Sequence, residues 1–376
     1  MIIAGEASGD LHGAALMSEY QKLIPAAEFY GIGGDNMINA GLKQSYHINN
    51  MAFLGFTEVV KHLPFIRKVR ADLISTVTEK NIKTIVLIDY PGFNLNFAAK
   101  IKKLGVTIIY YIPPQLWAWG VGRIKKIKKL IDKVIVVFPF EKDFYETHNV
   151  NVSCVGHPLI ERINDYNFVD KKEFYTKNNL DINKNILLIM PGSRLQEIEK
   201  IFPETISAAS KISKLFNMQI VVACSSNMDE NLFSSFKGEN DFTIIKGYTY
   251  ELLKYSYFGI IKSGTSTIET ALFELPFIVV YSTSAITYAM GKLLIKIKNI
   301  AMVNIVAGEN LVYELIQKDV NKKNIIAKCS YFLENEDNYS NLKNKLSGLK
   351  HLLGNSGAST KAAKIIYNIV NGTKKN

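Results

Sequence analysis

Short apolar runs rich in β-branched residues alternate with amphipathic helical patterns along almost the whole chain. This alternation is typical of parallel βα units. It predicts strands over 1–5, 27–32, 82–89, 106–112, 133–138 and 151–156, and then over 186–192, 218–224, 241–246, 257–262 and 276–282. The expected fold class is therefore α/β, with two Rossmann-like, doubly wound domains.

An irregular polar stretch after residue 156 separates the two sets of strands. We expect a first domain over 1–160, a second over 161–345, and a C-terminal helical segment over 346–376. Ligands of open α/β sheets bind beyond the carboxyl ends of the strands, and two such sheets facing each other would enclose a central cleft. Residues that directly follow strands are therefore the first candidates for a site.

Composition narrows the classes of protein. The chain has 376 residues, 48% of them hydrophobic, which is typical of a globular protein with sizeable cores. Its formal net charge of +11 favours an anionic partner, whether nucleic acid, a phosphorylated small molecule or a membrane face. Three widely spaced cysteines indicate neither a disulfide framework nor a metal site. With no signal peptide and no apolar run long enough to span a bilayer, we expect a cytoplasmic protein.

Two turns in the second half have the form of phosphate-binding turns. In "IMPGSRLQEIEK" a strand ends before Gly192, Ser193 occupies the expected N-cap, and Arg194 stands beside the helix start. Backbone N–H groups there attract anions. "IIKSGTSTIETALFELP" repeats this pattern with Ser263, Gly264, Thr265 and Ser266, and Glu269 follows one turn later, where a carboxylate suits a sugar diol. Ordinary helix caps are the alternative.

The first half has carboxylates where phosphate turns usually have none. Asp89 ends the run "IVLID" and is a candidate general base, although it could instead cap the next helix. The first turn, "GEASGD", carries Glu6, Ser8 and Asp10 and is better suited to sugar hydroxyls than to phosphate. His157, in "VGHPL", follows the last strand of this domain and is a further candidate.

An apolar and basic segment precedes the third predicted strand. Apolar anchors beside cations suit a contact with anionic lipid, and a packed amphipathic helix is the alternative. The residues concerned are Val59, Val60, Leu63, Phe65, Ile66, Arg67 and Lys68. The stretch from 288 to 302 has a similar pattern. The lysine-rich run after Trp117 and Trp119 is better explained as a solvated helix face, and nothing else indicates a nucleic-acid module.

Nine motifs occur in order over nearly the full chain: "AGEASGDLHGA", "GIGGDNM", "IDYPGFN", "WAWG", "FPFEKDFY", "VGHPL", "PGSRLQEIE", "SGTSTIET" and "NIVAGENLVYELIQ". Together they closely resemble the lipid-A-disaccharide synthase family. The resemblance implies the GT-B architecture and inverting transfer of 2,3-diacylglucosamine from UDP-2,3-diacylglucosamine to lipid X (2,3-diacylglucosamine 1-phosphate). The products would be the β-1,6-linked lipid A disaccharide 1-phosphate and UDP.

The resemblance also implies roles for single residues. Asp89 would be the base, the turns at 192–194 and 263–266 would hold UDP, Glu269 would bind ribose, and Asn304 would lie near the donor. No metal or other cofactor is implied, and the enzyme would work on the anionic cytoplasmic face of the inner membrane. Gly92 departs from the family pattern, which commonly has a second Asp there. The sequence also allows a homo-oligomer.

The alternatives are another UDP-sugar enzyme of the same architecture, such as a peptidoglycan-type glycosyltransferase or a UDP-GlcNAc epimerase, and a non-catalytic protein that binds anionic membranes or nucleic acid. The acidic first turn and "WAWG" disfavour the former. The non-catalytic reading leaves the carboxylates at the strand ends unexplained.

Overall fold

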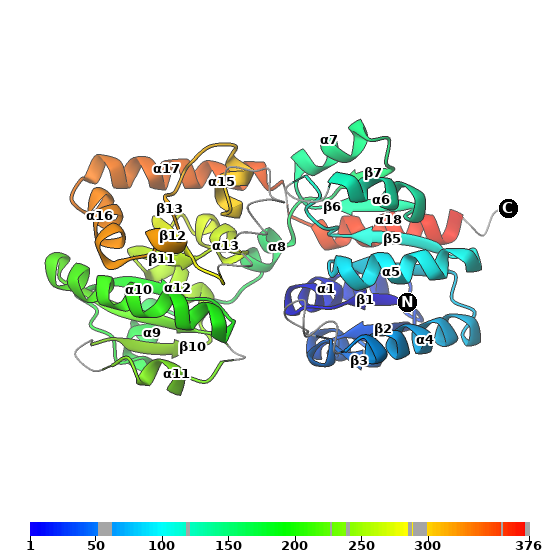
Figure 1. The fold of residues 1–376 in the computed structure, drawn as a ribbon, viewed down its shortest axis with the longest axis horizontal. Coiled ribbons are helices and arrows are strands. Elements are labelled where there is room, and N and C mark those ends of the chain that lie inside the picture. Colours follow the sequence, from blue (N-terminus) through cyan, green and yellow to red (C-terminus); the bar gives the residue numbers. More distant parts are fainter. Residues whose placement is uncertain are drawn as a thin grey trace. The chain divides into compact units, whose positions relative to one another are not determined.

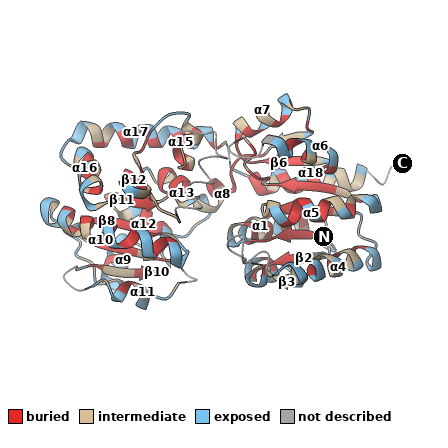
Figure 2. Ribbon diagram, viewed as in Figure 1, coloured by how far each residue is buried: buried red, intermediate tan, exposed pale blue. Residues whose placement is uncertain are grey.

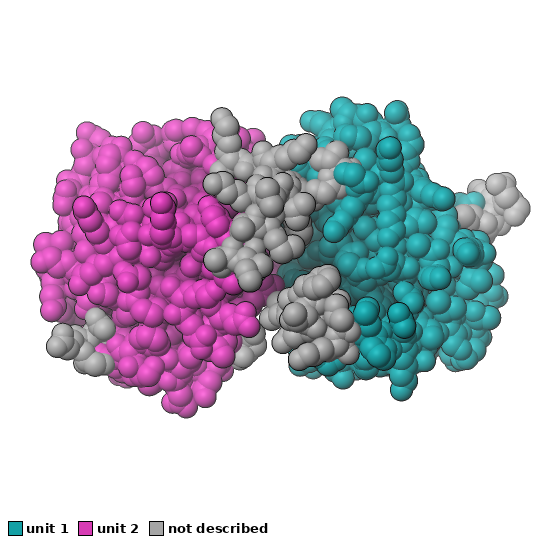
Figure 3. Space-filling model, viewed as in Figure 1, with its two compact units in different colours: residues 1–161, 353–376 teal, residues 162–352 magenta. Residues whose placement is uncertain are grey.

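The chain forms two compact units in a computed structural model (Figure 3). The structure describes residues 1–51, 62–117, 121–225, 228–237, 241–284, 288, 299–354 and 356–372. Unit 1 comprises 1–161 and 353–376, and unit 2 comprises 162–352. The stretch 346–376, expected as a separate segment, is thus divided between the two units.

Unit 1 is built on a parallel sheet whose strand order is β3-β2-β1-β4-β5-β6-β7 (Figure 1). Its central strands are runs of β-branched and aromatic residues that are buried on both faces, as covered parallel strands require. The strands are β1 (Ile2–Ala4), β2 (Phe29–Gly33), β3 (Leu42–His47), β4 (Thr84–Ile88), β5 (Thr107–Tyr111), β6 (Lys133–Val136) and β7 (Val152–Cys154).

Helices cover this sheet and complete its core. The helices described are α1 (Ala7–Leu23), α2 (Asp35–Asn39), α4 (Leu63–Glu79), α5 (Pro91–Ile101), α6 (Ile124–Leu130), α7 (Pro139–Thr147), α8 (Pro158–Asn164) and α18 (Ala358–Gly372), with 3-10 turns η1 (Ile48–Asn50), η2 (Lys102–Leu104) and η3 (Val121–Arg123). Helices α4, α5 and α6 contribute to one hydrophobic cluster with the strands. Helix α18 returns from the C-terminal end of the chain and packs on α1. The chain passes from unit 1 to unit 2 within α8.

Unit 2 is built on a second parallel sheet, in the order β10-β9-β8-β11-β12-β13. Its strands are β8 (Asn185–Met190), β9 (Met218–Cys224), β10 (Thr243–Lys246), β11 (Phe258–Lys262), β12 (Phe277–Tyr281) and β13 (Glu314–Ile316). The strands of both sheets are largely buried, whereas the outer helix faces are exposed (Figure 2).

The helices of unit 2 include the longest of those described, α10, whose 22 residues pack on α16 and on the sheet. The elements are α9 (Lys171–Lys177), α10 (Leu195–Phe216), α11 (Asn231–Ser234), α12 (Thr249–Tyr255), α13 (Ser266–Leu272), α15 (Met302–Ala307), η4 (Gln317–Asp319), α16 (Lys322–Leu333) and α17 (Glu336–Leu352). The predicted α/β class, with two parallel-sheet domains, is confirmed.

Candidate functional site

Each sheet has one pair of neighbouring strands at which the chain connections reverse direction. In unit 1 this pair is β1 and β4, and in unit 2 it is β8 and β11. Ligands of open α/β sheets bind beyond the carboxyl ends of the strands at such a point. The segments that follow these four strands, including the first residues of α1 and α13, cover 5–10, 89–90, 191–194 and 263–266. Most of the predicted site residues therefore lie at the two places where the topology favours a ligand.

Asp89 follows β4 directly and has a left-handed backbone conformation, with φ of 45°. Tyr90 is also left-handed, at φ 47°. The buried Asn94 amide donates to the carbonyls of Ile88 and Asp89 at 3.2 and 2.7 Å, and the Tyr110 hydroxyl donates to the Asp89 carbonyl at 2.7 Å. These bonds stabilise a turn in which two residues other than glycine adopt a costly conformation.

The carboxyl group of Asp89 has a raised pKa of about 6. Burial is the main cause, the charge of Glu6 adds to it, and a hydrogen bond from the Tyr90 backbone opposes it. A carboxyl that titrates this close to neutral pH is suited to accept a proton from a substrate. The N-cap of α5 is Tyr90, with no side-chain cap bond, so Asp89 does not cap that helix. Around Gly92 a Cβ would meet nothing within 4 Å.

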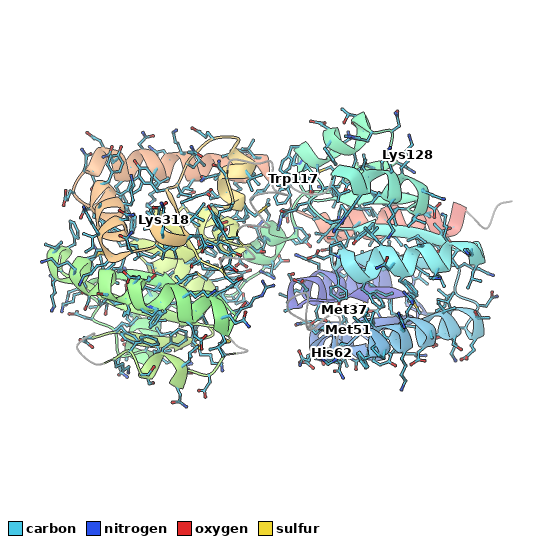
Figure 4. The ribbon with its side chains drawn as sticks, viewed as in Figure 1. Met37, Met51, His62, Trp117, Lys128 and Lys318 are labelled. Atoms are coloured by element: carbon cyan, nitrogen blue, oxygen red, sulfur yellow. The ribbon has the colours of Figure 1, made fainter. Side chains whose placement is uncertain are left out.

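The first turn makes room for the ring of Tyr90. A Cβ on Gly5 would lie 2.2 Å from Cγ of Tyr90, so only glycine fits beneath this ring. The Tyr90 hydroxyl donates at 2.9 Å to the carbonyl of Met51, a residue that Figure 4 labels. Glu6 is exposed at the N-cap of α1 without a side-chain cap bond, and Ser8 is half-buried in the first turn of that helix.

Asp10 was expected to face sugar hydroxyls, and its surroundings oppose that expectation. The side chain is 2% exposed and accepts from the backbone N–H groups of Gly34, Asn36 and Met37 at 2.7, 3.1 and 3.0 Å. It also accepts from the Asn36 amide at 2.8 Å. These groups lie at the start of α2, where unpaired N–H groups need acceptors. The carboxylate therefore caps α2 and serves the fold.

His157 lies directly before α8 and is buried. Its Nδ1 accepts from the backbone N–H of Leu159 at 3.2 Å, so the neutral ring carries its proton on Nε2. The ring centroid is 5.0 Å from that of Phe138 and 6.3 Å from that of His12. His12 belongs to α1, which follows β1, so His157 lies near the predicted site in unit 1.

A buried acid that was not predicted from the sequence, Glu141 of α7, lies nearby. It accepts from Trp117 Nε1 at 3.1 Å and from the backbone N–H of Phe138 at 3.3 Å. Burial raises the pKa of Glu141 to about 7. The motif "FPFEKDFY", with an acid three residues after the N-cap, was the available signal. Trp119 lies outside the described residues.

In unit 2 the turn after β8 opens α10 without a side-chain cap. The N-cap is Arg194 and not Ser193, as had been expected, and the Arg194 side chain makes no cap hydrogen bond. Gly192 has φ of 108°, a conformation that other residues rarely adopt. Ser193 and Arg194 are exposed. An uncapped start of a long helix can bind an anion.

A second residue missed from the sequence is Lys262, the last residue of β11. Its Nζ lies 2.9 Å from Oε2 of Glu197, in the first turn of α10, and 5.5 Å from the ring centroid of Tyr281. Glu197 also pairs with Arg194, at 3.7 Å between Oε1 and Nη1. The signal in the sequence is a cation immediately before the "SGTS" turn.

The hydroxyl groups of the second turn have partners in the fold. Ser263 donates to the carbonyl of Ile300 and Ser266 to that of Lys262, each at 3.1 Å. Thr265 is exposed at the N-cap of α13, and Gly264 has φ of 156°. The two serine hydroxyls thus brace the turn, and Thr265 presents its side chain to solvent.

Glu269, in α13, forms an ion pair with a residue that the sequence analysis did not single out. Its Oε1 lies 2.7 Å from Nη2 of Arg162, whose Nε donates to the Tyr250 hydroxyl at 2.5 Å. Burial raises the pKa of Glu269, and the Arg162 guanidinium opposes that rise. Arg162 therefore orients Glu269 at the end of the sheet.

Asn304 was expected near the donor, but its side chain is used inside the fold. It is 1% exposed, donates to the Val312 carbonyl and to Glu314 Oε1 at 2.9 and 2.8 Å, and accepts from the Val312 N–H at 3.0 Å. These bonds join α15 to β13. They use both N–H groups of the amide, so Asn304 supports the fold here, and its place near the donor stays a prediction.

The predicted membrane segment is described only in part. Val59 and Val60, and most of the stretch 288–302, lie outside the described residues. Leu63, at the start of α4, is 38% exposed. Arg67 and Lys68 are exposed one turn later. Phe65 and Ile66 are half-buried and pack against the core cluster of unit 1, so they contribute to the fold of this unit.

Among the residues that the structure describes, no group of three or more His, Cys, Asp or Glu could hold a metal ion. In the same residues, no helix is long and apolar enough to cross a membrane.

Comparison with known proteins first defines the class. The fold is similar to that of a UDP-GlcNAc 2-epimerase from Neisseria meningitidis, solved with bound UDP-GlcNAc, at a TM-score of 0.67 and 14% identity over 100% of this chain and 99% of that one. At this identity the likeness concerns the fold alone. The two parallel-sheet units are those of a GT-B fold.

The sequence comparisons define the family. Residues 1–370 match the family model described as lipid-A-disaccharide synthetase. The lipid-A-disaccharide synthase of Geobacter sulfurreducens is 36% identical over 373 residues, 98% of this chain and 97% of the relative. That of Coxiella burnetii is 33% identical over 371 residues, 98% of each chain. The chain belongs to the lipid-A-disaccharide synthetase family and is a glycosyltransferase.

Proposed function

We propose that this glycosyltransferase moves a 2,3-diacylglucosamine unit from UDP-2,3-diacylglucosamine to the primary hydroxyl of lipid X. The products are the β-1,6-linked disaccharide 1-phosphate and UDP. Family membership supports the reaction class. The observation that carries the mechanism is Asp89, a largely buried carboxyl with a pKa of about 6 at the reversal point of the sheet in unit 1.

In the proposed chemical step, Asp89 accepts the proton of the acceptor hydroxyl as its oxygen attacks the anomeric carbon. The bond from that carbon to the UDP oxygen breaks on the opposite face, so the configuration is inverted. A general base contributes about 10²–10⁴-fold to such a step. The left-handed turn, braced by Asn94 and Tyr110, fixes where the carboxylate lies.

The leaving UDP acquires negative charge, which unit 2 is suited to stabilise. The uncapped start of α10, the Arg194 side chain and the turn at 263–266 supply N–H groups and positive charge. Donors that are fixed in advance stabilise developing charge at little reorganisation cost. Glu269, oriented by Arg162, accepts hydrogen bonds from the ribose hydroxyls.

On the acceptor side, Glu6, Ser8 and His157 remain the proposed contacts with sugar hydroxyls. Both substrates carry acyl chains, so the enzyme must work at a lipid surface. Leu63, with Arg67 and Lys68 behind it, is the described part of the proposed contact with the anionic cytoplasmic face of the inner membrane. An apolar anchor beside cations is the pattern of such contacts.

The test is to incubate the protein with UDP-2,3-diacylglucosamine and lipid X in mixed micelles and to measure UDP and disaccharide together. Equal amounts of both products are expected. Parallel reactions with UDP-GlcNAc, with and without lipid X, test for a different UDP-sugar enzyme. Turnover of UDP-GlcNAc with none of the acylated donor would overturn the proposed substrates.

A further inference from the structure

Lys262 stands out because it is a mostly buried cation at the point where the topology of unit 2 favours a ligand. It ends β11, one of the two strands at which the connections reverse, and its side chain is 16% exposed. Burying a charge is costly unless it is paired. Lysines are rarely retained in such places without a partner or a task.

The two glycines of the neighbouring turns face this side chain. A Cβ on Gly192 would lie 3.3 Å from Cδ of Lys262, and a Cβ on Gly264 would lie 3.9 Å from its Nζ. Both glycines have positive φ. The turns after β8 and β11 therefore present backbone without side chains on either side of Lys262. A ligand that contacts the amine could come close to the same backbone.

One carboxylate holds two cations here. Glu197 pairs with the Lys262 amine at 2.9 Å and with the Arg194 guanidinium at 3.7 Å. Two positive groups share a single negative one, so the cluster has a surplus positive charge. Glu197 lies in the first turn of α10, whose N-cap residue, Arg194, makes no side-chain cap bond. The surplus positive charge and the N-terminus of α10 both attract an anion.

We propose that Lys262 contacts the diphosphate of the nucleotide donor, and that Glu197 holds its amine in place before the donor arrives. This rests on the proposed function, because it takes the ligand to be a nucleoside diphosphate. The contact stabilises both the bound donor and the departing UDP. An isolated structural ion pair would require neither the glycines on both sides nor the second cation on Glu197.

The experiment measures binding of UDP and of uridine, without turnover, by calorimetry. The test variant is Lys262→Gln, which removes the charge but retains a hydrogen-bond donor toward Glu197. The matched control is Lys246→Gln, because Lys246 also ends a strand of this sheet, β10, yet is exposed and donates to the Met228 carbonyl at 2.7 Å.

Lys262→Gln should weaken UDP binding by about tenfold or more, as expected for a lost hydrogen bond between charged groups. Uridine, which has no phosphate, should bind as to the wild type. Lys246→Gln should change neither affinity. Lys262→Arg, which keeps the charge, should recover most of the UDP affinity.

Unchanged UDP affinity in Lys262→Gln would overturn the proposal, and so would equal losses for UDP and uridine, which would mean that Lys262 only supports the turn. If Lys262→Gln does not fold, Lys262→Arg decides: the charge contact requires near-normal UDP binding there. A wild-type protein that does not bind UDP would refute the nucleotide donor itself, an outcome distinct from a loss confined to Lys262.

Discussion

Replacing Asp89 with Asn should abolish transfer and at the same time stabilise the protein at neutral pH. Asn has nearly the same shape and tolerates the left-handed conformation at φ 45°. It cannot ionise, so it corresponds to the protonated form of Asp89. The variant therefore removes the proposed base and a mostly buried negative charge in one change.

The size of the stabilisation follows from the pKa. Burial and Glu6 raise the pKa of Asp89 from 3.8 to about 6. This shift of about two units, at about 1.4 kcal/mol each, gives about 3 kcal/mol. The unfolded chain releases this proton near pH 4 and the folded chain near pH 6, so wild-type stability falls as the pH rises through this window. The gain in unfolding free energy from Asp89→Asn should be complete above about pH 6 and absent below about pH 4.

The assay is thermal unfolding of both proteins at about pH 4 and about pH 7.5. Unit 1 has about 185 residues, a size for which 1 kcal/mol shifts the midpoint by about 2–4 °C. Asp89→Asn should therefore unfold about 6–12 °C higher at neutral pH and at the wild-type temperature in acid. UDP release should fall by about 10²-fold or more. The control is Asp143→Asn, at an exposed position on α7, which should shift neither midpoint.

The stability of Asp89→Asn and its loss of activity are tested separately. A midpoint shift of the same size at both pH values would mean that Asp89 has no raised pKa. Transfer at the wild-type rate would exclude it as the base. For the active wild type, kcat/KM should rise with pH and level off above about pH 6, because only the ionised carboxylate accepts the proton.

Four further substitutions test other parts of the structure. Gly5→Ala should cost about 1–3 kcal/mol of unfolding free energy and most of the activity, because the added methyl overlaps the Tyr90 ring; wild-type melting and turnover would contradict the contact. Asn304→Ala should lower the unfolding free energy in urea by about 2–4 kcal/mol without raising the KM for the donor, and a selective rise in KM would return Asn304 to the site. Leu63→Ser should reduce sedimentation with anionic vesicles at an unchanged melting temperature, whereas Phe65→Ser should cost about 2 kcal/mol or more of stability; the reverse pattern would show that Phe65 faces lipid.

The sheets were largely predictable because buried parallel strands are continuous apolar runs. The strands that escaped prediction lack that pattern. In β3 only Leu42 is buried among mainly polar residues, and the pairing with β2 is irregular between Gly31 and Ile32. β13 has only three residues, Glu314–Ile316. Both lie at sheet edges, where pairing with a neighbour and not side-chain pattern defines the strand.

Positions at strand ends could be predicted because topology places them, but the partners of each side chain could not. Asp10 and Asp89 look alike in the sequence, as acids in turns after apolar strands. Asp10 meets N–H groups 24–27 residues away, whereas Asp89 keeps a largely buried, ionisable carboxyl. Likewise, Lys262 is recognised as a candidate site residue only through its ion pair with Glu197, 65 positions earlier in the chain. Such pairings depend on packing between distant segments, which local pattern does not encode.

The return of α18 to α1 has a consequence for the order in which a nascent chain folds. Thr360 donates to Glu19 at 2.6 Å and Ser359 donates to Glu161, so the last helix closes unit 1. Chains emerge from the ribosome N-terminus first. Unit 2, a continuous stretch from 162 to 352, is then complete while unit 1 still lacks its final helix. Unit 1, which contains Asp89, is synthesised first but completed last. A chain that stalled before residue 353 would expose the face of α1 that α18 covers.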